Sequence, residues 1–234
     1  MLKSMLTRVR VEALNALYPM QCLGCGTEGV ALCQQCRTKL PRLSKPYCDV
    51  CARSGVSGKC DWCRSHAPAV DGTFAPFLYV SSSPIHEAIT RLKFAGWRAV
   101  APELVELLAA FLDTQSLEVD IVAPVPSHPR RLRSRGFNQA ALIADALGKL
   151  THMRVAEGLL VRTTNAPSQL NMDSDDSRWS NVEGNFSCSG SVHGLRILVV
   201  DDLVTTGATM SACATALKEA GASKVTGLAV ARAP

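Results

Sequence analysis

Two adjacent carboxylates, Asp201 and Asp202, stand between an apolar strand and a loop of small and hydroxylated residues that leads into a helix. Unpaired N–H groups at the start of a helix favour an anion, and threonine hydroxyls add further donors. Carboxylates instead accept hydrogen bonds from neutral hydroxyls. The stretch therefore predicts a sugar-phosphate site, with the phosphate on the loop and the sugar hydroxyls on the carboxylates. The loop consists of Thr205, Thr206, Gly207, Ala208 and Thr209.

An ordinary strand–loop–helix turn with acidic and threonine caps is the alternative for this stretch. The strand, the paired acids, T-T-G-x-T and the helix occur in register, which favours ligand binding. The loop is neither a Walker A loop, because G-K-S/T is absent, nor the G-x-G-x-x-G dinucleotide signature.

A cluster of arginines follows the predicted strand that ends near residue 126. Four arginines within six residues can neutralise a pyrophosphate through bidentate hydrogen bonds, and we expect Arg131 and Arg135 to do so. A solvated surface or a DNA-contacting patch is the alternative. The four residues are Arg130, Arg131, Arg133 and Arg135.

Four more polar residues are candidates for the same site. Lys93 is expected to contact a phosphate, unless its amine only reaches solvent from the end of a helix. Asn138 and Gln139 open a helix and are either site residues or helix caps. His128 titrates near neutrality and is a candidate general base, although a single histidine is more often structural.

Eight of the ten cysteines form four C-x-x-C pairs between residues 22 and 63. Two residues between ligands let a tight turn direct both thiolates to one metal, and two such turns complete a tetrahedron. A disulfide framework is the alternative, but without a secretory signal we expect a reducing compartment. Sequential grouping predicts two structural zinc sites, while a crossed grouping of the first and third pairs stays open. The expected sites are Cys22, Cys25, Cys33 and Cys36, then Cys48, Cys51, Cys60 and Cys63.

The basic charge lies at the front of the chain. Residues 1–70 carry ten Lys/Arg and four Asp/Glu, whereas residues 71–234 carry fifteen and sixteen. Four thiolates outweigh one zinc ion by about two charges, so two sites lower the net charge of the chain from +5 to about +1. Nucleic-acid binding therefore does not follow from charge. Trp62 could stack on a base, but such a ring more often covers a zinc site. Cys188 and Cys213 receive no role, and Cys213 is expected to be buried in a helix.

Beyond residue 66 the patterns of helix and strand alternate. Residues 66–76 resemble a linker, and the polar residues 162–186 predict a functional loop or a disordered segment. Short apolar strands without polar alternation are typical of strands covered on both faces, which predicts a parallel, doubly wound sheet. The expected strands are 74–80, 119–126, 195–200 and 224–231, and the expected helices are 83–94, 101–112, 137–150 and 207–220.

The length of 234 residues suits one domain and a small module, and the apolar content of 47% excludes a wholly disordered chain. Residues 1–20 predict an amphipathic helix, with an arginine-bearing transit peptide as the alternative. No apolar run approaches the roughly 18 residues that span a bilayer. We expect a cytoplasmic protein with a zinc module at residues 21–66 and an α/β domain at residues 74–234.

Residues 197–210, ILVVDDLVTTGATM, resemble the motif by which type I phosphoribosyltransferases bind 5-phosphoribosyl 1-pyrophosphate (PRPP). In that family the loop holds the 5′-phosphate, the two acids bind the ribose hydroxyls, and Mg²⁺ carries the pyrophosphate. Residues 125–140, VPSHPRRLRSRGFNQA, resemble the signature of ComF-type proteins. These are phosphoribosyltransferase-like proteins with N-terminal zinc-binding cysteines, linked to competence and DNA uptake.

Further matches extend this resemblance from about residue 17 to residue 234, among them LYPMQCLGC and RLKFAG. The polar segment matches a pattern carried by Arg162, Gln169, Arg178, Asn181 and Phe186, which adds Gln169 and Arg178 to the candidate site residues. The resemblance implies a type I phosphoribosyltransferase-like parallel sheet with helices on both faces, preceded by a small zinc-ribbon module. The polar segment is expected to close over the site as a lid.

Together these observations predict a phosphoribosyltransferase-like protein that binds PRPP and Mg²⁺ and serves DNA uptake or the use of imported DNA. Transfer from ribose C1 would depend on Asp201 and Asp202 and on neutralisation of the pyrophosphate. No motif identifies the acceptor. One alternative is a non-enzymatic protein that binds single-stranded DNA and competence proteins and uses the sugar-phosphate site for regulation. Another is a base-salvage phosphoribosyltransferase.

Overall fold

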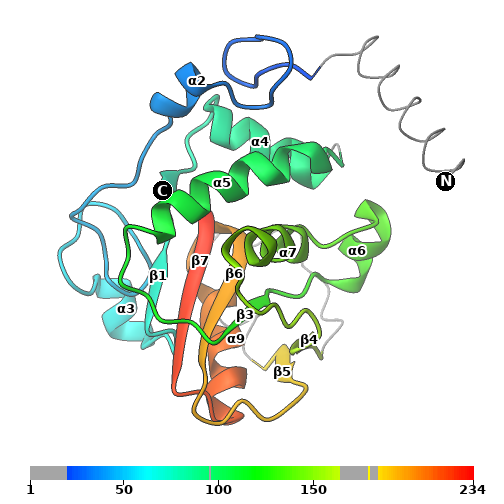
Figure 1. Ribbon diagram of the computed structural model, residues 1–234. Coiled ribbons are helices and arrows are strands. Elements are labelled where there is room, and N and C mark those ends of the chain that lie inside the picture. The colour runs from blue at the N-terminus through cyan, green and yellow to red at the C-terminus, as the bar shows by residue number, and fades with distance from the viewer. Residues whose placement is uncertain (1–19, 95, 164–178, 180–183) are drawn as a thin grey trace, which may run out of the picture.

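A parallel sheet with helices on both faces forms the body of the protein (Figure 1). The computed structural model describes residues 20–94, 96–163, 179 and 184–234. The strands run in the order β1-β7-β6-β3, and β2 also pairs with β7. Every pairing in this sheet is parallel, which confirms the predicted fold class. The strands are β1 (Gly72–Phe74), β2 (Phe77–Leu78), β3 (Ile121–Pro124), β6 (Arg196–Val204) and β7 (Lys224–Arg232).

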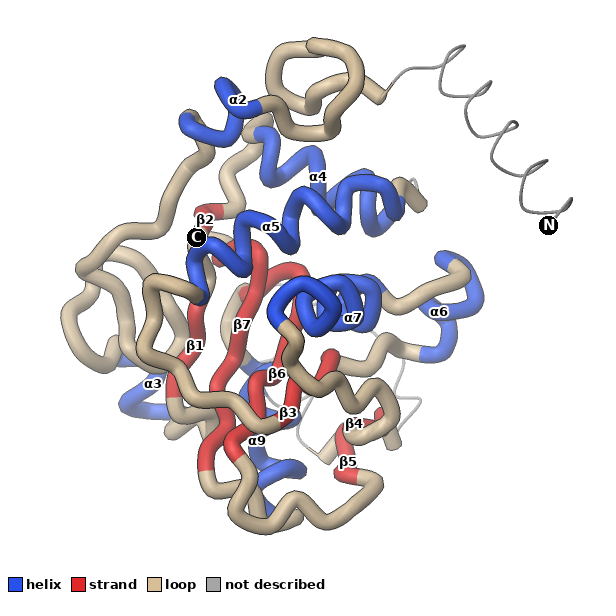
Figure 2. Tube along the Cα trace, in the orientation of Figure 1, coloured by secondary structure: helices blue, strands red, loops and turns tan. Residues whose placement is uncertain are grey.

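The central strands are covered on both sides because their successive side chains point to opposite faces. In β6, Leu198 and Val200 belong to one buried cluster, whereas Ile197 and Val199 belong to the other. The first cluster contains most buried apolar residues of α4, α5 and α7, and the second contains most of those of α9. These helices lie on opposite faces of the sheet (Figure 2). The longer helices are α4 (Pro84–Phe94), α5 (Ala101–Leu112), α7 (Gln139–Thr151) and α9 (Ala208–Glu219), and η1 (Arg98–Val100) precedes α5.

The two halves of the cysteine module attach to opposite parts of this body. The first half contains α2 (Gln34–Thr38) and docks on α5, where the Glu103 carboxylate accepts hydrogen bonds from the backbone of Ala31 and Leu32 at 2.6 and 2.5 Å. Arg37 reinforces the contact through Glu106 at 2.8 Å. The second half contains α3 (Asp61–His66), and its cysteines are part of the apolar cluster beneath α9.

Several local predictions were wrong. The expected strand 74–80 is two short strands broken at Ala75 and Pro76, and the expected linker contains β1. β6 continues to Val204, so the two aspartates lie within the strand rather than after it. Three further elements were not predicted: α6 (Pro129–Arg135) and the antiparallel pair of β4 (Leu160–Arg162) and β5 (Phe186–Cys188).

The residues outside the described part include the predicted N-terminal helix and most of the polar segment, with Gln169, Arg178 and Asn181. Within the described part, no helix combines the length and the apolar character needed to cross a membrane. Cys213 is buried in α9 as expected.

Candidate functional site

A cavity of about 440 Å³ opens where β3 and β6 end. Ligands of open α/β sheets bind at this edge, beyond the carboxyl ends of the strands. The segment after β3, the end of α4 and the loop after β6 meet there, although they are far apart in the sequence. The predicted residues that line the cavity are Lys93, Arg131, Arg135, Asn138, Gln139, Asp201, Asp202, Thr205 and Thr209.

Asp201 and Asp202 differ in their surroundings although they are adjacent. The carboxylate of Asp202 is almost completely buried and forms an ion pair with Lys93, whose Nζ lies 2.9 Å from Oδ2. Asp201 accepts a hydrogen bond from the backbone N–H of Asp202 at 2.8 Å. Burial and then repulsion from Asp202 raise the pKa of Asp201 well above its usual range, and Lys93 opposes this shift only in part. The pair therefore combines one carboxylate paired with Lys93 and one carboxyl that gains a proton readily.

In the loop after β6, some residues stabilise the loop itself and others face the cavity. Gly207 adopts φ +84°, a left-handed conformation that favours glycine, and serves as the N-cap position of α9. The buried hydroxyl of Thr206 accepts a hydrogen bond from the N–H of Ala208 at 3.3 Å, so it stabilises the loop itself. Thr205 and Thr209 line the cavity, and their hydroxyls are the loop side chains that can reach a ligand there.

Asn138 and Gln139 connect the opposite wall of the cavity to α7. Asn138 accepts from the N–H of Ala140 at 3.1 Å and donates to the carbonyl of Val125 at 2.9 Å, which makes it a helix cap. Gln139 accepts from Arg135 at 3.1 Å through Oε1, so its Nε2 is left as a donor on the cavity side. Both residues thus position the wall, and Gln139 also presents a polar group to the cavity.

His128 acts as a hydrogen-bond donor toward the cavity in this arrangement. Its Nδ1 accepts from the N–H of Arg130 at 3.1 Å, so in the neutral ring the proton resides on Nε2. Burial and then the charges of Arg162 and the α6 arginines lower the pKa of His128, which favours this neutral form. The hypothesis that His128 is a general base is therefore not supported, because its basic nitrogen is already occupied by the backbone.

Arg162 was missed as a site residue. It comes from β4, lies over the ring of Phe186 at 5.3 Å, and lines the cavity opposite the aspartates. Burial and the nearby Arg131 lower its pKa from the ordinary arginine value. Its position at the start of the polar segment was the sequence feature that could have indicated a site residue. The pairing of β4 with β5 directs its side chain to the cavity. Ser127, also missed, donates to Asn138 at 2.8 Å.

Four buried polar atoms at the cavity form no hydrogen bond with the described residues. Three are donors, His128 Nε2, Gln139 Nε2 and Arg162 Nε, and the fourth is the acceptor Asp202 Oδ2, which forms the ion pair with Lys93. A buried donor without a partner costs about 1–3 kcal/mol, so such groups usually have a ligand or water partner. Their common chemistry indicates a ligand part that is rich in acceptors, such as a phosphate or pyrophosphate.

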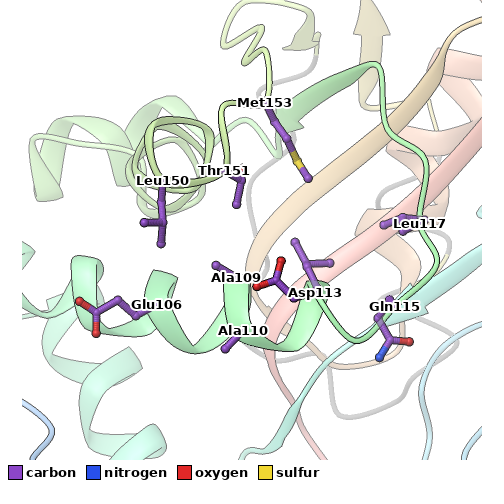
Figure 3. A pocket seen from close by; sticks show the side chains of 10 residues that line it. Glu106, Ala109, Ala110, Asp113, Gln115, Leu117, Leu150, Thr151 and Met153 are labelled. Atoms are coloured by element: carbon purple, nitrogen blue, oxygen red, sulfur yellow. The ribbon is translucent and has the colours of Figure 1, made fainter.

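A second cavity of about 600 Å³ lies between α5 and the end of α7 (Figure 3). Glu106 and Asp113 lie at its rim, and Ala109, Ala110 and Leu150 provide apolar surface. It contains none of the predicted site residues and no cationic side chain, so the chemistry favours the smaller cavity as the functional site.

The eight paired cysteines form two separate groups, in which the Sγ atoms lie within 4.8 Å of one another. The Sγ atoms of Cys25 and Cys33 are 3.6 Å apart, and those of Cys51 and Cys60 are 3.7 Å apart. Zinc with four thiolates at about 2.3 Å places neighbouring sulfurs about 3.8 Å apart, whereas a disulfide requires about 2.0 Å. The geometry fits two structural zinc ions and confirms the sequential grouping.

Comparisons with known proteins agree with this architecture. Two family models match the chain, a double zinc ribbon domain at residues 13–67 and a phosphoribosyl transferase domain at residues 133–234. The DNA utilization protein YhgH of Escherichia coli O6:H1 (strain CFT073) is 30% identical over 213 residues, which cover 83% of this chain and 93% of YhgH.

Two competence proteins are also similar. The competence protein ComFC of Bacillus subtilis (strain 168) is 26% identical, and the match covers 81% of this chain and 79% of ComFC. The competence protein F of Haemophilus influenzae is 26% identical over 230 residues, which cover 92% of this chain and 98% of that protein.

Proposed function

Because the chain belongs to the ComF family, and because its cavity joins paired carboxylates to a threonine loop, we propose that it binds PRPP together with Mg²⁺. The three buried donors at the opposite wall carry this proposal, since they are suited to a second anionic group beyond the 5′-phosphate. PRPP offers a phosphate, two neutral ribose hydroxyls and a pyrophosphate in that order. The relatives are named as DNA utilization and competence proteins, which supports a role for this protein in the use of DNA. We propose that it acts in the cytoplasm.

The ribose phosphate fits between the loop and the aspartates. Thr205, Thr209 and the backbone N–H groups at the start of α9 would hold the 5′-phosphate. The two aspartates would accept hydrogen bonds from the ribose hydroxyls. Lys93 pairs with Asp202, so the positive charge of the lysine offsets the charge of this buried carboxylate.

The pyrophosphate would lie against the donor wall. His128, Gln139 and Arg162 supply buried donors there, and Arg131 and Arg135 supply further guanidinium groups. When bound, Mg²⁺ would offset part of the pyrophosphate charge, and the aspartates are the described carboxylates that line this cavity. Neutralisation of the pyrophosphate makes it a better leaving group, because it departs with the electron pair of its bond to ribose C1.

We infer phosphoribosyl transfer as the reaction: an acceptor forms a bond to C1 while the bond from C1 to the pyrophosphate oxygen breaks. The neutral His128 positions the leaving group rather than taking a proton from the acceptor. A base or an amine could serve as acceptor. A panel of bases, assayed for pyrophosphate release, separates transfer from binding alone.

Removal of the two loop hydroxyls tests PRPP binding. The double change Thr205→Val and Thr209→Val keeps the branched shape but removes both donors, and we expect the affinity for PRPP to fall by about 10- to 100-fold. Isothermal titration calorimetry with Mg²⁺ present measures this. Thr215→Val is the matched control, because Thr215 lies on the same helix but outside the cavity. Equal affinity in the double variant, or no PRPP binding by the unaltered protein, would overturn the proposal.

PRPP affinity should also depend on pH. The pKa of Asp201 is raised, so at low pH this carboxyl is protonated and accepts ribose hydrogen bonds poorly. Affinity should therefore rise with pH through the raised pKa of about 8 and level off above it. The phosphates of the ligand also titrate near pH 6. Calorimetry on Asp201→Asn separates the two causes of the pH dependence, because only the titration of the PRPP phosphates remains in that variant.

A further inference from the structure

The second half of the cysteine module touches the threonine loop directly. Gly207 faces Cys51 so closely that a Cβ on this glycine would lie 3.6 Å from the Cβ of Cys51. The carbonyl of Cys51 accepts a hydrogen bond at 3.0 Å from Nε of Arg232, which is buried on β7. The residue that gives the loop its left-handed turn therefore rests against a metal ligand.

A second contact joins the same half of the module to the first turn of α9. The buried hydroxyl of Ser211 accepts a hydrogen bond from the backbone N–H of Ala69 at 3.0 Å. Ala69 follows α3, the short helix that carries Cys63. The start of α9, which we propose as the phosphate site, is thus held from outside by the chain that leaves the second metal site.

Aromatic rings form a third contact. Trp62, between Cys60 and Cys63, stacks on His66 with ring centroids 3.6 Å apart, and Trp179 meets Trp62 edge-on at 6.1 Å. Trp179 belongs to the polar segment that follows Arg162. Trp62 thus packs beside the second metal site, as the sequence predicted, and also contacts Trp179.

The first metal site has different neighbours. Its ribbon docks on α5 through Glu103 and Arg37, and none of its cysteines lines the cavity. Of the two sites, only the second is placed by described contacts against the threonine loop. The chain therefore contains its own internal control for any effect of metal binding on the cavity.

We propose that metal binding at Cys48, Cys51, Cys60 and Cys63 is coupled energetically to ligand binding at the threonine loop, with this metal site acting as a positioning element. Without the ion the four thiols lose their common partner, and the wall behind Gly207 loses its fixed position. Coupling is reciprocal, so a ligand that prefers the ordered loop must also tighten the hold on this metal ion. The inference rests on the proposed function for the identity of the ligand, PRPP.

Metal release from the unaltered protein tests the coupling. A chromogenic chelator should remove the zinc in two kinetic phases, one for each site. PRPP with Mg²⁺ should slow release from the second site by about fivefold or more and leave release from the first site unchanged. Cys25→Ser removes a ligand of the first site, so its remaining phase should be the one that PRPP slows. If calorimetry shows that PRPP binds but neither phase changes, the coupling does not exist.

Hydrogen exchange without any ligand separates failure of the coupling from failure of the proposed function. In Cys60→Ser, the amides of residues 207–211 should exchange about tenfold faster or more, while those of β3 keep their protection. In Cys25→Ser, residues 207–211 should exchange as in the unaltered protein. Unchanged exchange at residues 207–211 in Cys60→Ser would overturn the proposal. If Cys60→Ser loses protection in the whole domain, metal release from the unaltered protein is the test of the coupling.

Discussion

Asp201→Asn is expected to make the protein more stable and at the same time a poorer ligand binder. The pKa of Asp201 is raised in the folded protein, so ionising this carboxyl there costs more than in the unfolded chain. That cost is absent at pH values below the unfolded pKa of about 3.9 and grows as the pH rises toward the raised folded value. Asparagine keeps an oxygen for the N–H of Asp202 but carries no charge.

At neutral pH we expect the free energy of unfolding to rise by about 1–2 kcal/mol, which corresponds to a few degrees in melting temperature. At about pH 9, above the raised pKa of Asp201, the PRPP affinity should fall by about 10- to 100-fold, since a charged acceptor for ribose is lost. Thermal denaturation and calorimetry on the same preparation measure both effects. Asp145→Asn is the control, because Asp145 is exposed and its pair with Lys149 contributes little. A variant that is less stable at neutral pH would contradict this account of the site.

Arg162→Met is expected to abolish most of the affinity for pyrophosphate while leaving that for ribose 5-phosphate within about twofold. The Arg162 side chain is half-buried, has Arg131 nearby and presents a buried, unpartnered Nε that is available to an anion. A charge-assisted hydrogen bond contributes about 1.5–3 kcal/mol, which predicts a loss of about 10- to 150-fold. Methionine keeps an apolar stem over Phe186.

Competition experiments with inorganic pyrophosphate and with ribose 5-phosphate distinguish the two ends of the cavity. Arg133→Met is the matched control, because Arg133 is exposed on α6 and does not line the cavity. Arg162→Lys should not restore the affinity, since a lysine cannot reproduce the planar donor set. Equal losses for both ligands would show that Arg162 shapes the whole site instead of binding the pyrophosphate.

The sequence was sufficient for features that are local in the chain. The helix expected at residues 83–94 is α4, whose start is capped by the Ser83 hydroxyl, and the paired cysteines group sequentially. The turn from the threonine loop into α9 is local too, although β6 extends through both aspartates and ends later than predicted. These features depend on short-range hydrogen bonds and spacing, which the amino-acid order encodes directly.

Features that depend on distant pairing were not predictable. α6 has a cap at His128 and a positive-φ glycine at Gly136, but it buries no residue, so hydrophobic periodicity could not reveal it. Arg162 points inward only because β4 pairs with β5 across the polar segment. The ion pair between Lys93 and Asp202 requires that α4 and β6 already be packed on one core, which no local pattern states.

The position of β7 in the sheet has a consequence for the order in which this protein can fold. β7 lies between β1 and β6, yet it follows every other strand of the sheet in the chain. During synthesis the cysteine module, β1 and β2 leave the ribosome long before their partner exists. The first ribbon can take up metal early, because its four ligands are close in sequence. The second ribbon can bind its ion early as well, but its hydrogen bond to the sheet, from Arg232 to Cys51, forms only after β7 has been synthesised. Completion of the ligand cavity is therefore a late event that depends on long-range closure.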